Sequence, residues 1–113
     1  MQNLEKRILS KVGKPVKFKY PDGTLRPGTL KDRVVLPTQG ALSGKVYFDV
    51  IDLIEFEDEG ESIRFDYYIY ENRKLRWGSQ TTLTESKETI LILFQKACRE
   101  KSWFRELIEK SMI

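Results

Sequence analysis

The sequence predicts an α+β fold, in which a meander of about five antiparallel strands carries a short N-terminal helix and a C-terminal helical segment packed on the sheet. This prediction rests on three features. Apolar residues recur every four positions before Gly13, and they recur at helical spacing again after Leu83. Between these segments the chain alternates apolar with polar residues and is divided by turn-forming stretches. With 113 residues the chain has a common single-domain size, so we expect one domain over residues 1–113.

The N-terminal elements follow from spacing and turn chemistry. A helix capped by Asn3 and ended by Gly13 places three apolar residues on one face. These residues are Leu4, Ile8 and Val12. The strand that follows alternates apolar residues with lysine, and a second strand is predicted over Thr29–Leu36, beyond Pro27. The apolar residues of the first strand, which we expect to share a buried face, are Val16, Phe18 and Tyr20.

The segment from Lys17 to Leu30, KFKYPDGTLRPGTL, is similar to the opening hairpin of SH3-like and Tudor-like barrels. In those barrels an aromatic residue and Asp-Gly precede a second strand that begins with glycine. The resemblance implies that the sheet curls into a partial SH3-like barrel. It implies no aromatic ligand cage, because the aromatic residues in this segment, Phe18 and Tyr20, are expected to be buried.

The middle of the chain predicts a loop, a buried strand and an exposed turn. Residues 37–45 form the loop, and the spacing of Gly40 and Gly44 does not match a phosphate-binding loop. The strand covers Val46–Phe56, and its apolar phase shifts near two aspartates, which indicates a bulge or a strand buried on both faces. These aspartates are Asp49 and Asp52. The acidic residues around Gly60 predict a solvated turn, since their spacing differs from that of a calcium-binding loop.

Residues 62–82 predict a β-hairpin whose register depends on the loop length. A loop of two or four residues pairs Tyr70 with Leu75, whereas a three-residue loop, Glu71–Arg73, pairs Ile69 with Leu75. We choose the three-residue loop because it keeps the apolar residues of both strands on one face. We expect that face to be buried beneath Ile90, Phe94 and Ala97. Its residues are Phe65, Tyr67, Ile69, Leu75 and Trp77.

The opposite face of this hairpin combines aromatic with basic side chains in the chosen register. Tyrosine rings stack on nucleic-acid bases, and arginine or lysine binds phosphates. The alternative is an ordinary solvated sheet face, where the same residues pack across strands. The candidate binding residues on this face are Arg64, Tyr68, Tyr70, Lys74 and Arg76.

The C-terminal segment predicts a helix, capped by Thr84 or Ser86, with a broad apolar stripe. Charged residues interrupt this stripe, so the helix either breaks near Ser102 or projects beyond the sheet. Trp103 and Phe104 then either form a patch that binds another protein or a second copy of the chain, or close the core. We favour core closure.

Charge is segregated along the chain, although the net charge is only +3. Residues 1–33 hold nine basic and three acidic residues, and residues 34–61 hold one basic and seven acidic residues. We expect these two blocks to neutralise one another across the fold.

The residue inventory favours a non-enzymatic binding module over an enzyme. The chain has no histidine and one cysteine, Cys98, which excludes a disulfide and an ordinary zinc site, and it shows no nucleophile motif. We expect no catalytic residue, cofactor or metal ion; the alternative is a small enzyme of unidentified reaction. The expected partners are another protein, a second copy of the chain or single-stranded nucleic acid. Because no long apolar run or signal peptide is present, we expect a cytoplasmic protein without membrane association.

Overall fold

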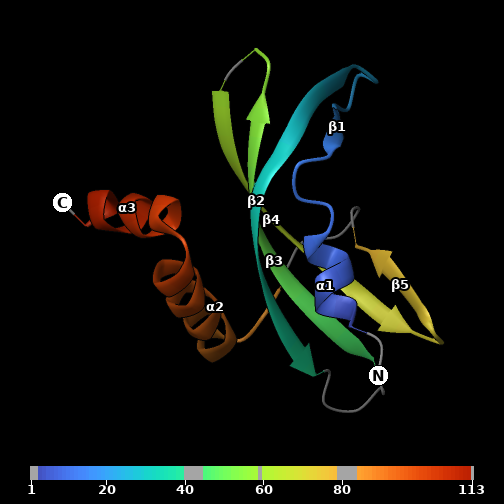
Figure 1. Ribbon diagram of the computed structural model, residues 1–113, viewed down its shortest axis with the longest axis vertical. Coiled ribbons are helices and arrows are strands. Elements are labelled where there is room, and N and C mark those ends of the chain that lie inside the picture. Colours follow the sequence, from blue (N-terminus) through green and yellow to red (C-terminus); the bar gives the residue numbers. More distant parts are fainter. Residues whose placement is uncertain (1–2, 40–44, 59, 79–83, 113) are drawn as a thin grey trace.

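The computed structural model describes residues 3–39, 45–58, 60–78 and 84–112, and it confirms the predicted α+β meander. Five antiparallel strands form one sheet in sequence order, and the sheet curls into a half-barrel (Figure 1). The elements are α1 (Leu4–Leu9), β1 (Pro15–Lys19), β2 (Leu25–Gln39), β3 (Val46–Phe56), β4 (Gly60–Glu71), β5 (Lys74–Trp77), α2 (Lys87–Glu100) and α3 (Ser102–Ser111). None of the helices in these ranges has the length and apolar character needed to cross a membrane.

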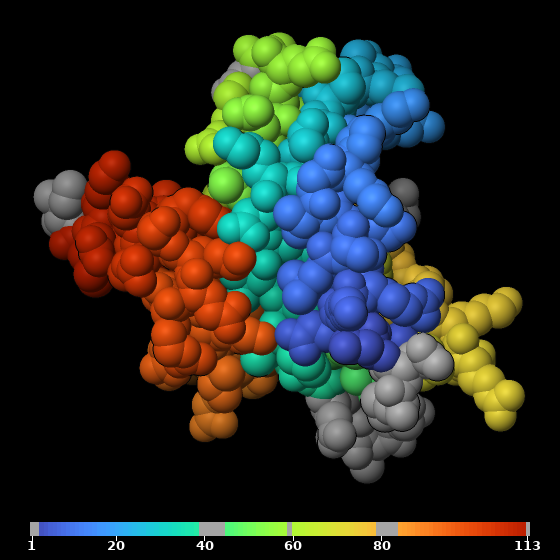
Figure 2. Space-filling model, in the orientation of Figure 1, coloured from blue at the N-terminus to red at the C-terminus, as the bar shows by residue number. Residues whose placement is uncertain are grey.

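Helices cover both faces of the sheet. Figure 2 shows α1 and β1 lying along one side of β2, while α2 and α3 stand out on the other side. We call these the α1 face and the α2 face. The α1-face core contains Leu4, Ile8, Val35, Phe48 and Val50. The α2-face core contains Val34, Ile51, Leu93, Ala97 and Phe104. Strand β3 contributes to both cores, so it is buried on both faces, which is one of the two alternatives that its sequence indicated.

Helix α1 begins as predicted and ends earlier. The Asn3 side chain accepts a hydrogen bond from the Lys6 backbone N–H at 3.2 Å, as an N-cap does. The helix stops at Leu9, and Gly13 follows a further turn with a φ of 90°. The Gly13 N–H then donates to the Leu30 carbonyl oxygen at 2.6 Å, so this turn is tied to β2.

Strand β2 is longer than Thr29–Leu36 because both of its ends pair. Pro27 pairs with Lys17 of β1 but has no partner on β3, because the pairing of β2 with β3 begins at Gly28. Proline is tolerated at such an edge position because one side of the strand needs no N–H donor. Residues 37–39, predicted as loop, pair with the start of β3, whereas Gly40 and Gly44 lie outside the described residues. The register shifts at Lys31, and this bulge places both Leu30 and Arg33 on the α1 face.

The predicted register of the last hairpin is wrong. Tyr70 pairs with Leu75, and Glu71 pairs with Lys74, which leaves a turn of two residues. These residues, Asn72 and Arg73, have φ values of 52° and 62°. Such a turn follows the right-handed twist of the strands even without glycine. The predicted register assumed that apolar residues lie on one buried face, but helices cover both faces of the sheet, so apolar residues occur on both.

The observed register moves Leu75 and Trp77 to the α1 face and leaves Phe65 on the α2 face. Phe65 is 47% exposed and stacks on Phe94 at 6.0 Å, so its predicted burial is wrong, as is that of Trp77. Ile69 is buried as predicted.

The C-terminal helical segment breaks near Ser102, as one of the two alternatives predicted. Ser86 caps α2 by accepting a hydrogen bond from the Thr89 N–H at 3.1 Å, and Lys101 between the helices is extended. Phe104 is buried against the sheet and meets Phe94 edge to face at 5.1 Å. Phe104 therefore closes the α2-face core.

Candidate functional site

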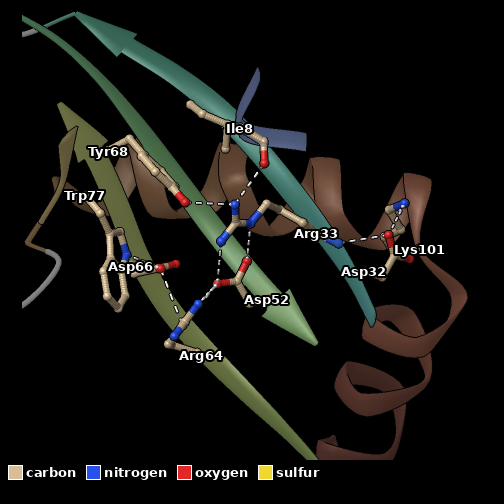
Figure 3. A network of polar contacts seen from close by, with 9 residues as sticks. All are labelled: Ile8, Asp32, Arg33, Asp52, Arg64, Asp66, Tyr68, Trp77 and Lys101. Carbon is tan, nitrogen blue, oxygen red and sulfur yellow. Dashed lines mark hydrogen bonds and ion pairs between the residues drawn. The ribbon is translucent and has the colours of Figure 1, made fainter. Parts of the chain in front are cut away.

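A charged residue from each of three neighbouring strands meets on the α1 face. Arg33 of β2, Asp52 of β3 and Arg64 of β4 lie opposite one another in the sheet register. Arg33 donates from Nε and Nη2 to the two Asp52 oxygens at 2.6 and 3.1 Å (Figure 3). Arg64 donates from Nε and Nη2 to Asp52 Oδ2 at 3.1 and 2.9 Å. The fully buried carboxylate of Asp52 is therefore shared by two guanidinium groups, and its single negative charge offsets one of their two positive charges.

Arg33 also connects this cluster to α1. Its side chain is 2% exposed, and Nη1 donates to the Ile8 carbonyl oxygen at 2.9 Å and to the Tyr68 hydroxyl at 3.0 Å. The Ile8 carbonyl lies near the C-terminal end of α1, where a cation is favourable. Burial lowers the pKa of Arg33, but the hydrogen bonds and charge of Asp52 outweigh burial and raise the pKa above its usual value. Arg33 therefore stays charged.

Asp66 holds the ring of Trp77 beside the cluster. Trp77 Nε1 donates to Asp66 Oδ2 at 2.5 Å, and the Arg64 guanidinium lies 4.8 Å from the centre of the Trp77 ring. Burial and the charge of Asp52 together raise the pKa of Asp66 to about 7, although the charge of Arg64 acts in the opposite direction. When Asp66 is protonated, the two arginines and two aspartates carry one net positive charge.

A pocket of about 390 Å³ opens beside this cluster. Leu30 and Trp77 both line the pocket, and Trp77 is 41% exposed. The pocket's basic and aromatic lining residues are Lys11, Lys14, Lys17, Arg33, Arg64, Tyr68 and Trp77. These residues come from β1 and the chain leading into it, from β2, and from β4 and β5, so the pocket lies between the two sides of the half-barrel.

The half-barrel is open between β1 and β4, where the pocket lies. Over the residues that the structure describes, β1 pairs only with β2, and the first half of β4, residues 60–66, pairs only with β3. We call the opening between β1 and β4 the seam. Within the same described ranges, the side chains of Lys11, Lys14 and Lys17 form no ion pair or hydrogen bond.

Three other basic residues of the N-terminal block, Arg26, Lys31 and Arg33, are neutralised as expected. Arg26 pairs with Asp58 at 3.1 Å, and Lys31 lies 3.3 Å from Glu61. Together with the pair of Arg33 and Asp52, these contacts link the basic residues 1–33 to the acidic residues 34–61. The three lysines at the seam have no such partner among the described residues, so they form a positive surface.

The structure brings together only part of the predicted basic and aromatic face. Arg64 and Tyr68 line the pocket, and Tyr70 lies on the same face against the α1-face core. Lys74 and Arg76 lie on the α2 face, because the two-residue turn reverses their orientation relative to the prediction. Trp77 takes the place opposite Tyr68 that Arg76 was expected to fill.

The predicted pair at the start of α3 lies in the α2-face core. Phe104 is buried, and Trp103 Nε1 donates to Asp32 Oδ2 at 2.9 Å. Lys101 donates to the other Asp32 oxygen at 2.8 Å. Burial raises the pKa of Asp32, but the Lys101 and Trp103 hydrogen bonds outweigh it and hold the pKa below the usual value. Asp32 thereby anchors the junction of α2 and α3 to the sheet.

The ion cluster and the lysines at the pocket were not predicted from the sequence. A signal for the cluster was present, since burial on both faces was one of the two alternatives for the strand that holds Asp52, and a buried carboxylate requires a partner. No local sequence pattern predicts that Lys11, Lys14 and Lys17 lie near Trp77, because their proximity depends on the curl of the whole sheet.

A further buried carboxyl, Asp49, lies on the α2 face and is separate from the pocket. Neither of its oxygens has a hydrogen-bond partner within the described part of the chain. Burial raises the pKa of Asp49 to about 8, and the neighbouring Glu85 carboxyl contributes in the same direction. Asp49 is therefore largely protonated at neutral pH. The described residues contain no group of three or more acidic or cysteine side chains placed to hold a metal ion.

The pocket at the seam is thus the site whose geometry bears on function: it combines an exposed indole, a buried arginine cluster and lysines without partners among the described residues. Comparison of the chain with protein-family models, with curated proteins and with solved structures found no match.

Proposed function

We propose that the protein is a non-enzymatic binding protein whose pocket beside Trp77 holds a segment of single-stranded nucleic acid. One observation carries this proposal. An exposed indole ring and three lysines without ion-pair partners in the described ranges line the same pocket. Aromatic rings beside a basic groove are the combination that proteins use to bind single strands with little sequence preference.

The indole of Trp77 is suited to stacking on a base. Its ring is held by the hydrogen bond to Asp66 and by the nearby Arg64 guanidinium, so little conformational freedom is lost when a base stacks on its exposed part. Stacking of one base on an aromatic side chain is worth about 1–3 kcal/mol. Duplex DNA buries its base faces, which favours a single strand in this pocket.

The lysines are suited to the backbone phosphates. Each phosphate contact to a single strand lowers the slope of log affinity against log salt by about 0.7. Contacts from Lys11, Lys14 and Lys17 therefore predict a slope of about −2. Arg64 lines the same pocket, and its guanidinium is already oriented by Asp52.

A peptide that adds as a strand is the second candidate. It is favoured by the edges of β1 and of β4 residues 60–66, which lack strand partners in the described part of the chain. Exposed lysines on an edge strand disfavour such pairing, and β1 carries Lys17 and Lys19. Strand addition also needs no aromatic ring, so it leaves Trp77 unexplained.

An enzyme is disfavoured by how the charged groups of the site are used. Asp52 accepts four hydrogen bonds from two arginines, and Asp66 Oδ2 is held by Trp77. A general base needs a free oxygen facing the substrate, and neither aspartate lines the pocket.

The test is a fluorescence anisotropy titration at low salt with a labelled oligothymidylate of about twelve nucleotides and a duplex of the same length. We expect the single strand to bind more tightly, and Trp77→Ala to weaken binding by about 5- to 150-fold, the equivalent of one lost stacking contact. Lys17→Ala should weaken binding and make the slope of log affinity against log salt less negative by about 0.7. Lys74→Ala is the matched control, because Lys74 lies on the opposite face.

Three results would contradict the proposal. These are equal affinity for the duplex, equal effects of Lys17→Ala and Lys74→Ala, and no binding at tens of micromolar protein. Salt-independent binding of a peptide that resists Trp77→Ala would favour strand addition instead.

A further inference from the structure

A second pocket continues the seam beyond Arg64. Its volume is about 360 Å³, and it lies between the end of β1 and residues 62–65 of β4. Its aromatic and basic lining residues are Phe18, Tyr20, Arg26, Phe56, Arg64 and Phe65. Arg64 lines both pockets, so they adjoin at this side chain.

The order of the two pockets along the strands shows that they follow one line. The first pocket uses residues 15–17 of β1 with Arg64 and Tyr68 of β4. The second uses Phe18 and Tyr20 with residues 62–65 of β4. Three successive antiparallel pairings connect β1 to β4, so these two strands run in opposite directions. Residue numbers therefore rise along β1 and fall along β4 from the first pocket to the second, and both pockets lie on one line along the seam.

The aromatic residues of the second pocket are open to solvent although their sequence pattern predicts burial. Phe18 is 42% exposed and Tyr20 is 38% exposed, and their ring centres lie 6.2 Å apart. Phe18 also meets Phe56 edge to face at 6.3 Å, which fixes its position. In a closed barrel a neighbouring strand would cover these rings, whereas here the seam leaves them beside a hollow.

Contacts already present leave the second pocket aromatic rather than strongly charged. The Arg26 guanidinium lies 3.7 Å from the centre of the Phe56 ring and pairs with Asp58. The lysines gather at the first pocket, and Arg64 lies between the two. A chain molecule with planar rings and regularly spaced negative charges matches this arrangement, in which Arg64 lies between a lysine-lined pocket and an aromatic pocket.

We infer that the seam is a continuous track with two base-binding subsites, one at Trp77 and one at Phe18 and Tyr20, and that Arg64 binds a backbone phosphate between them. The inference rests on the proposed function and specifies its ligand as an unpaired run of several nucleotides rather than a mononucleotide. From Val16 to Tyr20 the extended chain advances about 13 Å, which is longer than one nucleotide.

The test measures affinity for oligothymidylates of one to eight nucleotides, with the wild-type chain and with Tyr20→Ala and Phe18→Ala/Tyr20→Ala. The wild-type affinity should rise with length until both subsites are occupied. The double variant should bind the longest oligonucleotide about 10-fold or more weakly and bind the mononucleotide as the wild type does. Leu107→Ala, an exposed apolar residue on α3, is the matched control and should change neither affinity.

The outcomes separate the inference from the proposed function. If the wild-type chain binds oligonucleotides but both variants keep its length dependence, the second subsite is refuted and the proposed function stands. If the wild-type chain binds no oligonucleotide of any length, both are refuted. Tyr20 lies outside β1, so Tyr20→Ala leaves strand pairing intact, and a partial loss of the length dependence in this variant supports the inference even if the double variant unfolds.

Discussion

The ion cluster on the α1 face predicts that Asp52→Asn destabilises the protein far more than its small change in shape implies. The substitution leaves no cavity, but it removes the negative charge that two guanidinium groups share. Asp52 accepts four hydrogen bonds of 2.6 to 3.1 Å and is fully buried. Arg64 can turn toward solvent, whereas Arg33 cannot, because its neighbours enclose it.

The magnitude follows from the cost of an uncompensated buried charge. Removing one partner of a buried ion pair costs about 3–5 kcal/mol, which is a large part of a typical folding free energy of about 5–15 kcal/mol. Glu55→Gln is the matched control on the same strand, because Glu55 pairs with Lys31 at 3.6 Å in an exposed contact. Exposed pairs contribute about 0–1 kcal/mol.

Urea unfolding followed by tryptophan fluorescence measures both variants, with the free energy of unfolding obtained by linear extrapolation. A double variant, Arg33→Met with Asp52→Leu, removes both members of the buried pair. It should recover much of the loss, since apolar residues of similar size often replace a buried pair at little cost. A loss below about 1 kcal/mol for Asp52→Asn, equal to that of Glu55→Gln, would refute this reasoning.

Three further predictions concern the turn, the second buried carboxyl and the core. Arg73→Gly should raise the free energy of unfolding by about 1 kcal/mol, because Arg73 has a φ of 62°; a lower melting temperature would contradict the two-residue turn. The raised pKa of Asp49, about 8 when folded against an ordinary 3.8, means that wild-type stability falls as pH rises from about 4 to 8 and then levels. Asp49→Asn should remove this part of the decline in denaturant unfolding at a series of pH values, and an unchanged profile would contradict it. Phe104→Ala should cost about 3–5 kcal/mol in the same assay, whereas a cost within about 0.5 kcal/mol would show that Phe104 does not close the core.

The elements that sequence analysis located well are those set by local interactions. Side-chain caps fix the starts of α1 and α2, so Asn3 was recognisable without knowledge of the fold, and Ser86 was one of two candidates with Thr84. The apolar run of Val46–Phe56 matches β3 because a strand buried on both faces needs apolar residues at nearly every position.

The hairpin register was not predictable from alternation. A single buried face would have selected the register that aligns Ile69 with Leu75, but α1 covers one face of the sheet and α2 the other. The turn geometry decided the pairing instead, through two non-glycine residues with positive φ.

The candidate site was only partly predictable for the same reason. Arg64 and Tyr68 were identified because alternation within one strand is local. Trp77 was placed on the wrong face by the register, and Arg33 faces the cluster only because of the bulge at Lys31. The convergence of Lys14 and its neighbours on the pocket depends on the curl of the sheet, which no local pattern reports.

The proposed site can be mapped residue by residue through photochemical cross-linking to a single strand that carries 4-thiothymidine, followed by mass spectrometry of the peptides. We expect cross-links at Trp77 and Tyr68 and within residues 11–20, because these line the seam. An excess of unlabelled single strand should suppress them, and duplex should not. Cross-links concentrated on α2 and α3, or at Lys74 and Arg76 on the opposite face, would contradict the assignment of the seam as the nucleic-acid site.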